Sequence, residues 1–225
     1  MKKRYFITFG VVFLVLLIDQ IVKIWVKTSF DYDDPSVNLL GDWFQLNYVE
    51  NQGMAFGATL GGGIWGKLIL SLFRLIAIVA ITIYILKQIR RAVRLEFLIV
   101  TGLVLAGAMG NLLDSMFYDF IFSHQFDPCI PYNQLEGSGI WAECSYYGYT
   151  EPVEIRHRGF LFGNVVDMFQ FDVLWPEWVP WVGGSQVFPA VWNVADAAIS
   201  VGVILVLIRQ KVYFPRHKKQ ENSDL

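Results

Sequence analysis

Charged residues are scarce in this chain of 225 residues. Asp, Glu, Lys and Arg make up 17% of it, whereas a soluble domain carries about 25%. The formal net charge of −2 argues against the basic surface of a nucleic-acid-binding protein. Three histidines are present and none lies in a His-Glu-x-x-His pattern, which makes a zinc protease unlikely. The sequence also lacks a Gly-x-Ser-x-Gly elbow and a glycine-rich phosphate loop, so it offers no serine-hydrolase or nucleotide-binding signature.

Hydrophobic residues, by contrast, make up 55% of the chain and gather in four long segments. A transmembrane helix needs about 20 mostly apolar residues. The first segment follows Lys2, Lys3 and Arg4 but has no small-residue cleavage site, so we interpret it as a retained helix. We expect a membrane α-helical fold and a single integral membrane domain over 1–225, with transmembrane helices at about 5–26, 67–86, 97–118 and 187–208.

The basic residues indicate how these helices are oriented. Most of the 18 lie before the first segment, between the second and third, or after the fourth. Because positive residues concentrate on the cytoplasmic side, this pattern predicts a multi-pass membrane protein with both termini in the cytoplasm. The two remaining loops, at about 28–66 and 119–186, would then face outward.

The outer loops carry features of folded structure. The stretch from Trp43 to Val49 alternates in part and is rich in aromatic residues, which predicts a strand. We expect a small β-rich platform on the outer leaflet. Cys129 and Cys144 both lie in the second loop, where an oxidising compartment would preserve a disulfide. Two free thiols are the alternative, and no His or Cys pair nearby has the spacing of a zinc site.

Ionisable side chains interrupt the predicted helices, although each costs about 2.5–3.5 kcal/mol at the centre of a membrane helix. Their positions at intervals of three and four residues put them on shared helix faces near the outer leaflet, which suggests one site. The alternative is structural, with an ion pair pinning helices together and amides bonding between them. The set comprises Asp19, Lys23, Arg74, Asp114 and Asp196, with the amides Asn111 and Asn193.

Asp167 and Asp196 are the strongest candidates for chemistry. Two carboxylates in a dry site do not both ionise easily, so one retains a proton. The ionised one accepts a proton from water while the protonated one donates to a scissile carbonyl. With no other catalytic signature in the chain, this pair predicts peptide hydrolysis.

Five short motifs, in order along nearly the whole chain, resemble those of the lipoprotein signal peptidase (signal peptidase II) family. Any one of them is a weak signal, whereas all five on a four-helix membrane chain are specific. They are Asp19-Gln20 with Lys23, Asn51-Gln52-Gly53-Met54-Ala55-Phe56-Gly57, Gly107-Ala108-Met109-Gly110-Asn111-Leu112-Leu113-Asp114, Val165-Val166-Asp167-Met168-Phe169 and Trp192-Asn193-Val194-Ala195-Asp196.

The resemblance implies an intramembrane aspartic endopeptidase with four helices and an extracytoplasmic β-cradle. Such an enzyme removes the signal peptide from diacylglyceryl-modified prolipoproteins, cutting just before the lipidated lipobox cysteine. Asp167 and Asp196 would be the catalytic pair. The resemblance also implies no metal or organic cofactor, and inhibition by globomycin-like cyclic peptides. Residues that would bind substrate or support the pair are Asn51, Gly53, Asn111, Asp114, Asn193, Asp19 and Lys23.

Two departures from the family and two other functions stay open. Ser115 follows Asp114 where the family commonly has Arg, and Arg74, Arg156 or Arg158 are candidate replacements. The stretch of about 119–160 is long for the family and has no assigned role. A small transporter would use the buried acids as an ion relay, but four helices without an inverted repeat are few for one. A non-catalytic membrane scaffold would keep the groove without needing the acids. We expect a monomer that contacts membrane lipids and its lipidated substrates.

Overall fold

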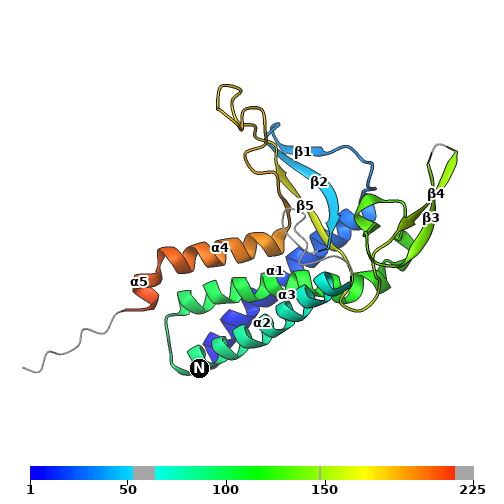
Figure 1. Ribbon diagram of the computed structural model, residues 1–225. Helices are drawn as coiled ribbons and strands as arrows, with labels where there is room; N and C mark the ends of the chain where they lie inside the picture. Colours follow the sequence, from blue (N-terminus) through cyan, green and yellow to red (C-terminus); the bar gives the residue numbers. More distant parts are fainter. Residues whose placement is uncertain (53–63, 147, 216–225) are drawn as a thin grey trace, which may run out of the picture.

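The computed structural model describes residues 1–52, 64–146 and 148–215. Long helices lie side by side along a common direction, and a small sheet stands at one end of them (Figure 1). The helices are α1 (Lys2–Ser29), α2 (Ile64–Arg90), α3 (Leu95–Ile121) and α4 (Val194–Ile208), followed by the short α5 (Gln210–Tyr213). Of these, α1, α2 and α3 are long and apolar enough to cross a membrane, which fits three of the four predicted spans.

The fourth predicted span is wrong at its start. The sequence predicts a helix from about residue 187, but residues 187–193 contain the short strand β6 (Val191–Trp192), and α4 begins only at Val194. Asn193 ends the extended segment because its side chain accepts from the backbone N–H of Asp196, while the Asp196 carboxylate accepts from the backbone N–H of Asn193. This reciprocal capping box starts the helix there. The helix has 15 residues and so spans about 22 Å, less than the ~30 Å of a hydrocarbon core.

Helix α3 is the centre of the bundle, since it packs against α1, α2 and α4. Glycines allow this close approach. A Cβ at Gly107 would overlap the backbone oxygen of Ala195, and one at Gly110 would lie 2.6 Å from Oδ2 of Asp19. Small residues at helix contacts are the usual means of close packing in membranes. Gly107 and Gly110 therefore bring α4 and α1 directly against α3 at the end of the bundle that carries the sheet.

The sheet has four antiparallel strands in the order β1-β2-β5-β6. They are β1 (Val37–Leu40), β2 (Phe44–Asn51), β5 (Val165–Phe171) and β6, and the predicted strand at 43–49 is confirmed from Phe44 onward as part of β2. Val49 pairs with Asp167 and Asn51 with Val165. A core cluster from α1, α3, β2 and β5 fixes the sheet on the helix ends: Val26, Leu46, Tyr48, Tyr118, Phe122, Val166 and Met168.

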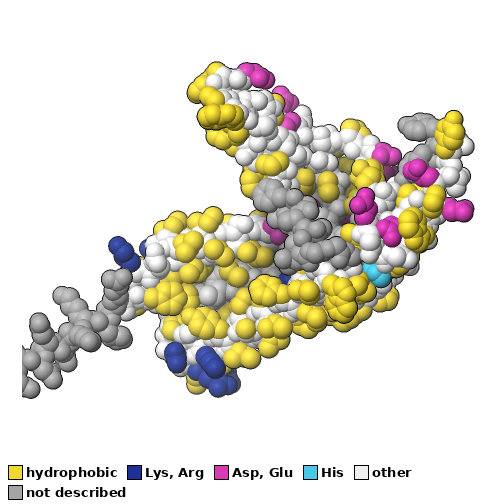
Figure 2. Space-filling model, viewed as in Figure 1, with side chains coloured by type: hydrophobic (Ala, Val, Ile, Leu, Met, Phe, Trp, Pro, Cys, Tyr) yellow, Lys and Arg dark blue, Asp and Glu magenta, His cyan; other side chains and the backbone are white. Residues whose placement is uncertain are grey.

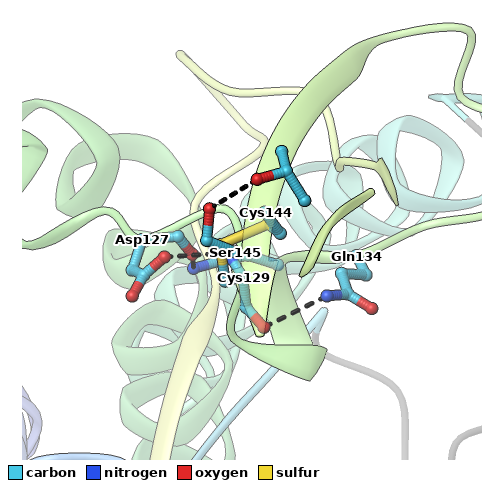
Figure 3. The surroundings of a disulfide bond; sticks show 7 residues. Asp127, Cys129, Gln134, Cys144 and Ser145 are labelled. Carbon is cyan, nitrogen blue, oxygen red and sulfur yellow. Dashed lines mark hydrogen bonds between the residues drawn. A yellow bond between two sulfur atoms is a disulfide. The ribbon is translucent and has the colours of Figure 1, made fainter. Parts of the chain in front are cut away.

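The long segment after α3 folds onto the end of that helix. It contains the short 3-10 helices η2 (Ser123–Gln125) and η3 (Pro131–Asn133) and the hairpin of β3 (Trp141–Tyr146) and β4 (Tyr149–Glu154). A disulfide joins Cys129 to Cys144, with a Cα–Cα distance of 5.3 Å, and ties the loop to β3 (Figure 3). Arg156 forms an ion pair with Asp119 at 2.7 Å, which anchors the segment to α3.

A second projection leaves the sheet after β5. Val187 donates its backbone N–H to the carbonyl of Val173 at 2.8 Å, which closes residues 173–187 into a loop that we call the aromatic arm. Trp178 and Trp181 on this arm are 81% and 102% exposed. Figure 2 shows hydrophobic side chains on one side of the end of this projection and acidic side chains on the other. The same view shows Lys and Arg at the opposite end of the helices from the sheet.

Candidate active site

Two acids meet where the sheet joins the bundle. Asp167 lies in the middle of β5, with 2% of its surface exposed, and Asp196 lies in the first turn of α4. Because α4 starts later than predicted, Asp196 is close to its helix end and not two or three turns into it. Both carboxylates line one cavity of about 1000 Å³.

Asn193 connects the two carboxylates. Its Nδ2 donates to Oδ1 of Asp167 at 2.5 Å, and its backbone N–H donates to Oδ2 of Asp196 at 3.4 Å. The Asn193 side-chain oxygen accepts from the backbone N–H of Asp196 at 2.9 Å. One residue therefore starts α4 and sets the position of both acids.

Two further side-chain amides donate hydrogen bonds to the pair, one to each carboxylate. Asn51, the last residue of β2, donates its side-chain N–H to Oδ2 of Asp167. Asn111 on α3 donates from Nδ2 to Oδ1 of Asp196 at 2.7 Å. Each carboxylate thus accepts a side-chain amide from a different element, and these contacts fix the carboxylate planes relative to each other.

The pKa of Asp167 is raised well above its usual range. Burial is the main cause, and the neighbouring Asp196 carboxylate is the second. The Lys23 ammonium and the hydrogen bond from Asn193 oppose the rise in pKa without cancelling it. A carboxyl with a raised pKa beside another acid is the electrostatic condition under which a pair shares one proton.

Lys23 of α1 lies beneath the pair, fully buried among acceptors. Its Nζ donates to Oδ1 of Asn111 at 2.9 Å and forms ion pairs with Asp114 at 2.7 Å and Asp19 at 3.2 Å. Asp19 in turn accepts the backbone N–H of Ala195 at the start of α4, at 2.8 Å. Asp114 accepts the backbone N–H of Val166, next to Asp167, at 3.3 Å. Asp19 and Asp114, which Lys23 joins, therefore contact the backbone on both sides of the site.

The structure brings nearly all of the predicted site residues together. Gly53 lies outside the described residues. Those found in one connected network are Asp167, Asp196, Asn51, Asn111, Asn193, Asp19, Lys23 and Asp114. No group of three His, Cys, Asp or Glu side chains in the described ranges could hold a metal ion.

The contacts of two polar residues near the site, Gln20 and Lys67, were not anticipated. Gln20 donates from Nε2 to Oδ1 of Asp114 at 3.0 Å and accepts from the Tyr118 hydroxyl at 3.1 Å. Lys67 on α2 donates to Oγ of Ser115 at 3.4 Å, and that hydroxyl donates to the backbone oxygen of Asn111. Gln20 was visible as a polar neighbour of Asp19 inside an apolar run, whereas the pairing of Lys67 with Ser115 depends on how α2 packs against α3.

The fold and the site together define an integral membrane protein with an acid-lined cavity at one end of its helical bundle. Comparison with known proteins supplies the family. A family model described as signal peptidase (SPase) II matches residues 11–212. The chain therefore belongs to the signal peptidase II family, which is a family of proteases.

Named relatives agree with this assignment. The lipoprotein signal peptidase of Porphyromonas gingivalis is 38% identical over 206 residues, covering 88% of this chain and 80% of the relative. That of Amoebophilus asiaticus is 33% identical over 219 residues, covering 94% and 80%. A solved structure described as a bacterial membrane enzyme has a TM-score of 0.53 at 20% identity, covering 94% of this chain and 93% of its own. That likeness supports the fold.

Proposed function

We propose that this chain is an aspartic endopeptidase of the bacterial inner membrane that removes signal peptides from diacylglyceryl-modified prolipoproteins. Its cut falls just before the lipidated cysteine. The observation that carries the proposal is the bridging of Asp167 and Asp196 by Asn193 on the wall of one cavity. Membership in the signal peptidase II family supports the reaction and the substrate class.

The two acids divide the work of hydrolysis through one shared proton. We assign the resting proton to Asp167; burial and the neighbouring Asp196 carboxylate both raise the pKa of Asp167, which supports this assignment. The Asp196 carboxylate takes a proton from water, whose oxygen attacks the scissile carbonyl carbon, while Asp167 donates its proton to the carbonyl oxygen. The resulting diol collapses with cleavage of the C–N bond: one diol hydroxyl returns its proton to Asp167, and the amine leaves with the proton that Asp196 received. The products are a new carboxylic acid and a new amine, with no cofactor required.

The lining of the cavity suits a lipidated peptide. Beside the acids it is largely apolar, with contributions from the sheet and from the outward face of α4. Apolar walls with a few fixed polar groups are typical of sites that bind apolar ligands in one orientation. The lining continues along α4, which would let a signal helix lie beside it. The apolar and small residues of the lining include Phe171, Phe188, Trp192, Ala197, Val201 and Ile204.

Charge distribution supports one orientation in the membrane. The basic residues at the end of the bundle away from the sheet would lie in the cytoplasm, together with both termini. The carboxylate pair then lies near the outer leaflet, where the substrate's diacylglyceryl group resides. The Cys129–Cys144 disulfide fits an oxidising compartment on that side. In this arrangement α4 makes the fourth crossing, and the basic residues that follow it lie in the cytoplasm.

A scaffold or an ion relay explains the site less well. The polar network gathers at one end of the bundle, whereas a relay would trace a path across the membrane. A scaffold has no use for two adjacent acids that raise the cost of burial.

The test is cleavage of a diacylglyceryl-modified prolipoprotein by purified enzyme in lipid, followed as a mobility shift. Wild type should cleave, while Asp167→Asn and Asp196→Asn should both be inactive although folded. Asp172→Asn is the matched control, because Asp172 lies at the end of the same strand region but is exposed. It should retain wild-type turnover. Near-normal cleavage by either Asp167→Asn or Asp196→Asn would refute the assigned mechanism.

A further inference from the structure

Helix α2 carries a polar stripe on its inner face. Lys67, Ser71 and Arg74 are spaced by four and three residues, so they lie on one face of an otherwise apolar helix. Lys67 donates to the backbone oxygen of Gln52 at 2.8 Å, and Ser71 donates to that of Leu161 at 2.8 Å. These two side chains therefore attach α2 to the segments that surround the site.

Arg74, the third member of the stripe, lines the cavity that holds the two acids. Its guanidinium shares that cavity wall with the carboxylates of Asp167 and Asp196. Among the described residues of the cavity wall, Arg74 is the cation. An ionised group within a membrane helix is a functional candidate because its burial is costly.

The other two arginines considered from the sequence have different places. Arg156 is buried against Asp119, to which it donates through both Nη atoms at 2.7 and 3.0 Å. Arg158 lies over the Phe126 ring, 4.0 Å from its centroid, and its side chain is exposed. Neither lines the cavity.

We propose that Arg74 is a substrate-contacting residue whose guanidinium donates hydrogen bonds to a carbonyl oxygen of the lipidated substrate in the cavity. A guanidinium presents several N–H donors in a planar fork, so one face can interact with Asp196 while other donors reach the substrate. The apolar walls strengthen such a charge-assisted bond because they exclude water. The carbonyl belongs either to the peptide beside the cleavage site or to an acyl ester of the diacylglyceryl group.

This proposal rests on the proposed function, so the experiment contains an arm for each. Wild type, Arg74→Gln and Asp167→Asn are assayed for kcat and KM on two prolipoprotein substrates. One substrate carries the ester-linked diacylglyceryl group, and the other carries a dialkyl ether analogue that lacks the acyl carbonyls. Arg158→Gln is the control, because it removes an arginine that is exposed and away from the cavity.

Arg74→Gln should lower kcat/KM on the ester substrate by about 10- to 100-fold, the range expected for loss of a hydrogen bond to a charged group. If the contact is to an acyl ester, the kcat/KM of wild type should be lower by a similar factor on the ether substrate than on the ester substrate. The kcat/KM of Arg74→Gln should then differ little between the two substrates. If the contact is to the peptide, the effect of Arg74→Gln should be equal on both substrates. Arg158→Gln should match wild type.

Kinetics of Arg74→Gln within threefold of wild type on both substrates would overturn the role of Arg74 and leave the peptidase intact. Failure of wild type to cleave a verified lipidated substrate would overturn the proposed function and this proposal with it.

A second variant and a second measurement distinguish substrate contact by Arg74 from a role in packing alone. Arg74→Lys keeps the charge but not the fork, so it should fold and show a several-fold loss of kcat/KM. The acidic limb of the pH–rate profile should move to higher pH in Arg74→Gln, because a nearby cation favours the ionised state of the carboxylate pair. If Arg74→Gln does not fold while Arg74→Lys has wild-type kinetics, Arg74 serves packing and the proposal is wrong.

Discussion

The ammonium of Lys23 donates to the side-chain oxygen of Asn111 at 2.9 Å, and this contact determines which way the Asn111 amide faces. A lysine ammonium has only donors, so the oxygen of the amide must point toward it. The nitrogen is thereby directed at Asp196, to which it donates at 2.7 Å. A residue of α1 thus sets the hydrogen-bonding state of a carboxylate on α4 without contacting it.

Lys23→Met should severely destabilise the protein. The substitution leaves Asp19 and Asp114 buried without their cation, and breaking a buried pair in this way costs about 3–5 kcal/mol. Thermal unfolding in detergent and the yield of monodisperse protein measure the effect. Asp114→Asn is the comparison, because it leaves Lys23 paired with Asp19, and it should be less destabilising. Equal stability of Lys23→Met and wild type would contradict the assigned role of the cation.

Asn193→Ser separates helix capping from support of the acid pair. Serine is also a good N-cap, so α4 should start at the same place. The variant lacks the amide that donates to Asp167, so kcat should fall by about 10- to 100-fold. Unfolding and turnover are measured on the same preparation. Full activity in Asn193→Ser would show that the amide contact is dispensable.

Wild type should lose stability relative to Asp167→Asn as the pH rises. A carboxyl with a higher pKa in the folded than in the unfolded protein binds more protons when folded. Its contribution to the free energy of unfolding is therefore fully present below the unfolded pKa of about 3.9 and declines as the pH rises toward the pKa in the folded protein. Asparagine does not titrate in this range.

Thermal unfolding of both proteins is measured from about pH 4, near the unfolded pKa of aspartate, to about pH 8. The melting temperature of Asp167→Asn minus that of wild type should grow with pH. A constant difference, whatever its size, would contradict a raised pKa at Asp167.

Removal of the disulfide should reduce stability without removing activity. The loop between Cys129 and Cys144 spans 15 residues, and the chain-entropy contribution for such a loop is about 3 kcal/mol. Neither cysteine lines the cavity. A Cys129→Ser, Cys144→Ser double variant should therefore unfold at lower temperature yet cleave substrate at wild-type rates well below its melting point. Loss of cleavage in a folded double variant would instead place the segment after α3 in the reaction.

The aromatic arm should contact lipid in the proposed orientation. Trp178 and Trp181 are both exposed, and tryptophan favours the membrane interface. In vesicles containing brominated lipids, the wild-type fluorescence should be quenched more than that of a Trp178→Ser, Trp181→Ser variant. Equal fractional quenching of the two proteins would show that the arm stands clear of the bilayer.

Much of the architecture follows from local sequence pattern. Three helices are recognisable from long apolar runs, and the spacing of Asp19 to Lys23 and of Asn111 to Asp114 correctly predicted which side chains share a helix face. Those spacings repeat with the helix period, so local pattern was enough.

Contacts between segments distant in sequence were harder to predict from the sequence. The start of α4 was missed because residues 187–193 are as apolar as the helix that follows, and only the reciprocal bonds of Asn193 and Asp196 end the extended segment. Arg156 looked like a candidate for the site, but Asp119 binds it 37 residues away in sequence. Arg74 was already distinguished as an ionisable residue in a predicted helix, but only the tertiary packing of α2 shows that it reaches the cavity.

The pairing of Lys23 with Asp19 within one helix also bears on how the chain is assembled. The two lie one turn apart on α1, 3.2 Å between Nζ and Oδ2, so this helix brings its own counter-ion. During biosynthesis α1 emerges before α3 and its Asp114, and an internally neutral pair lowers the cost of entering the bilayer at that stage. We therefore expect α1 to enter the lipid before α3 is made. When α3 follows, Lys23 is already in the membrane, and Asp114 pairs with it there.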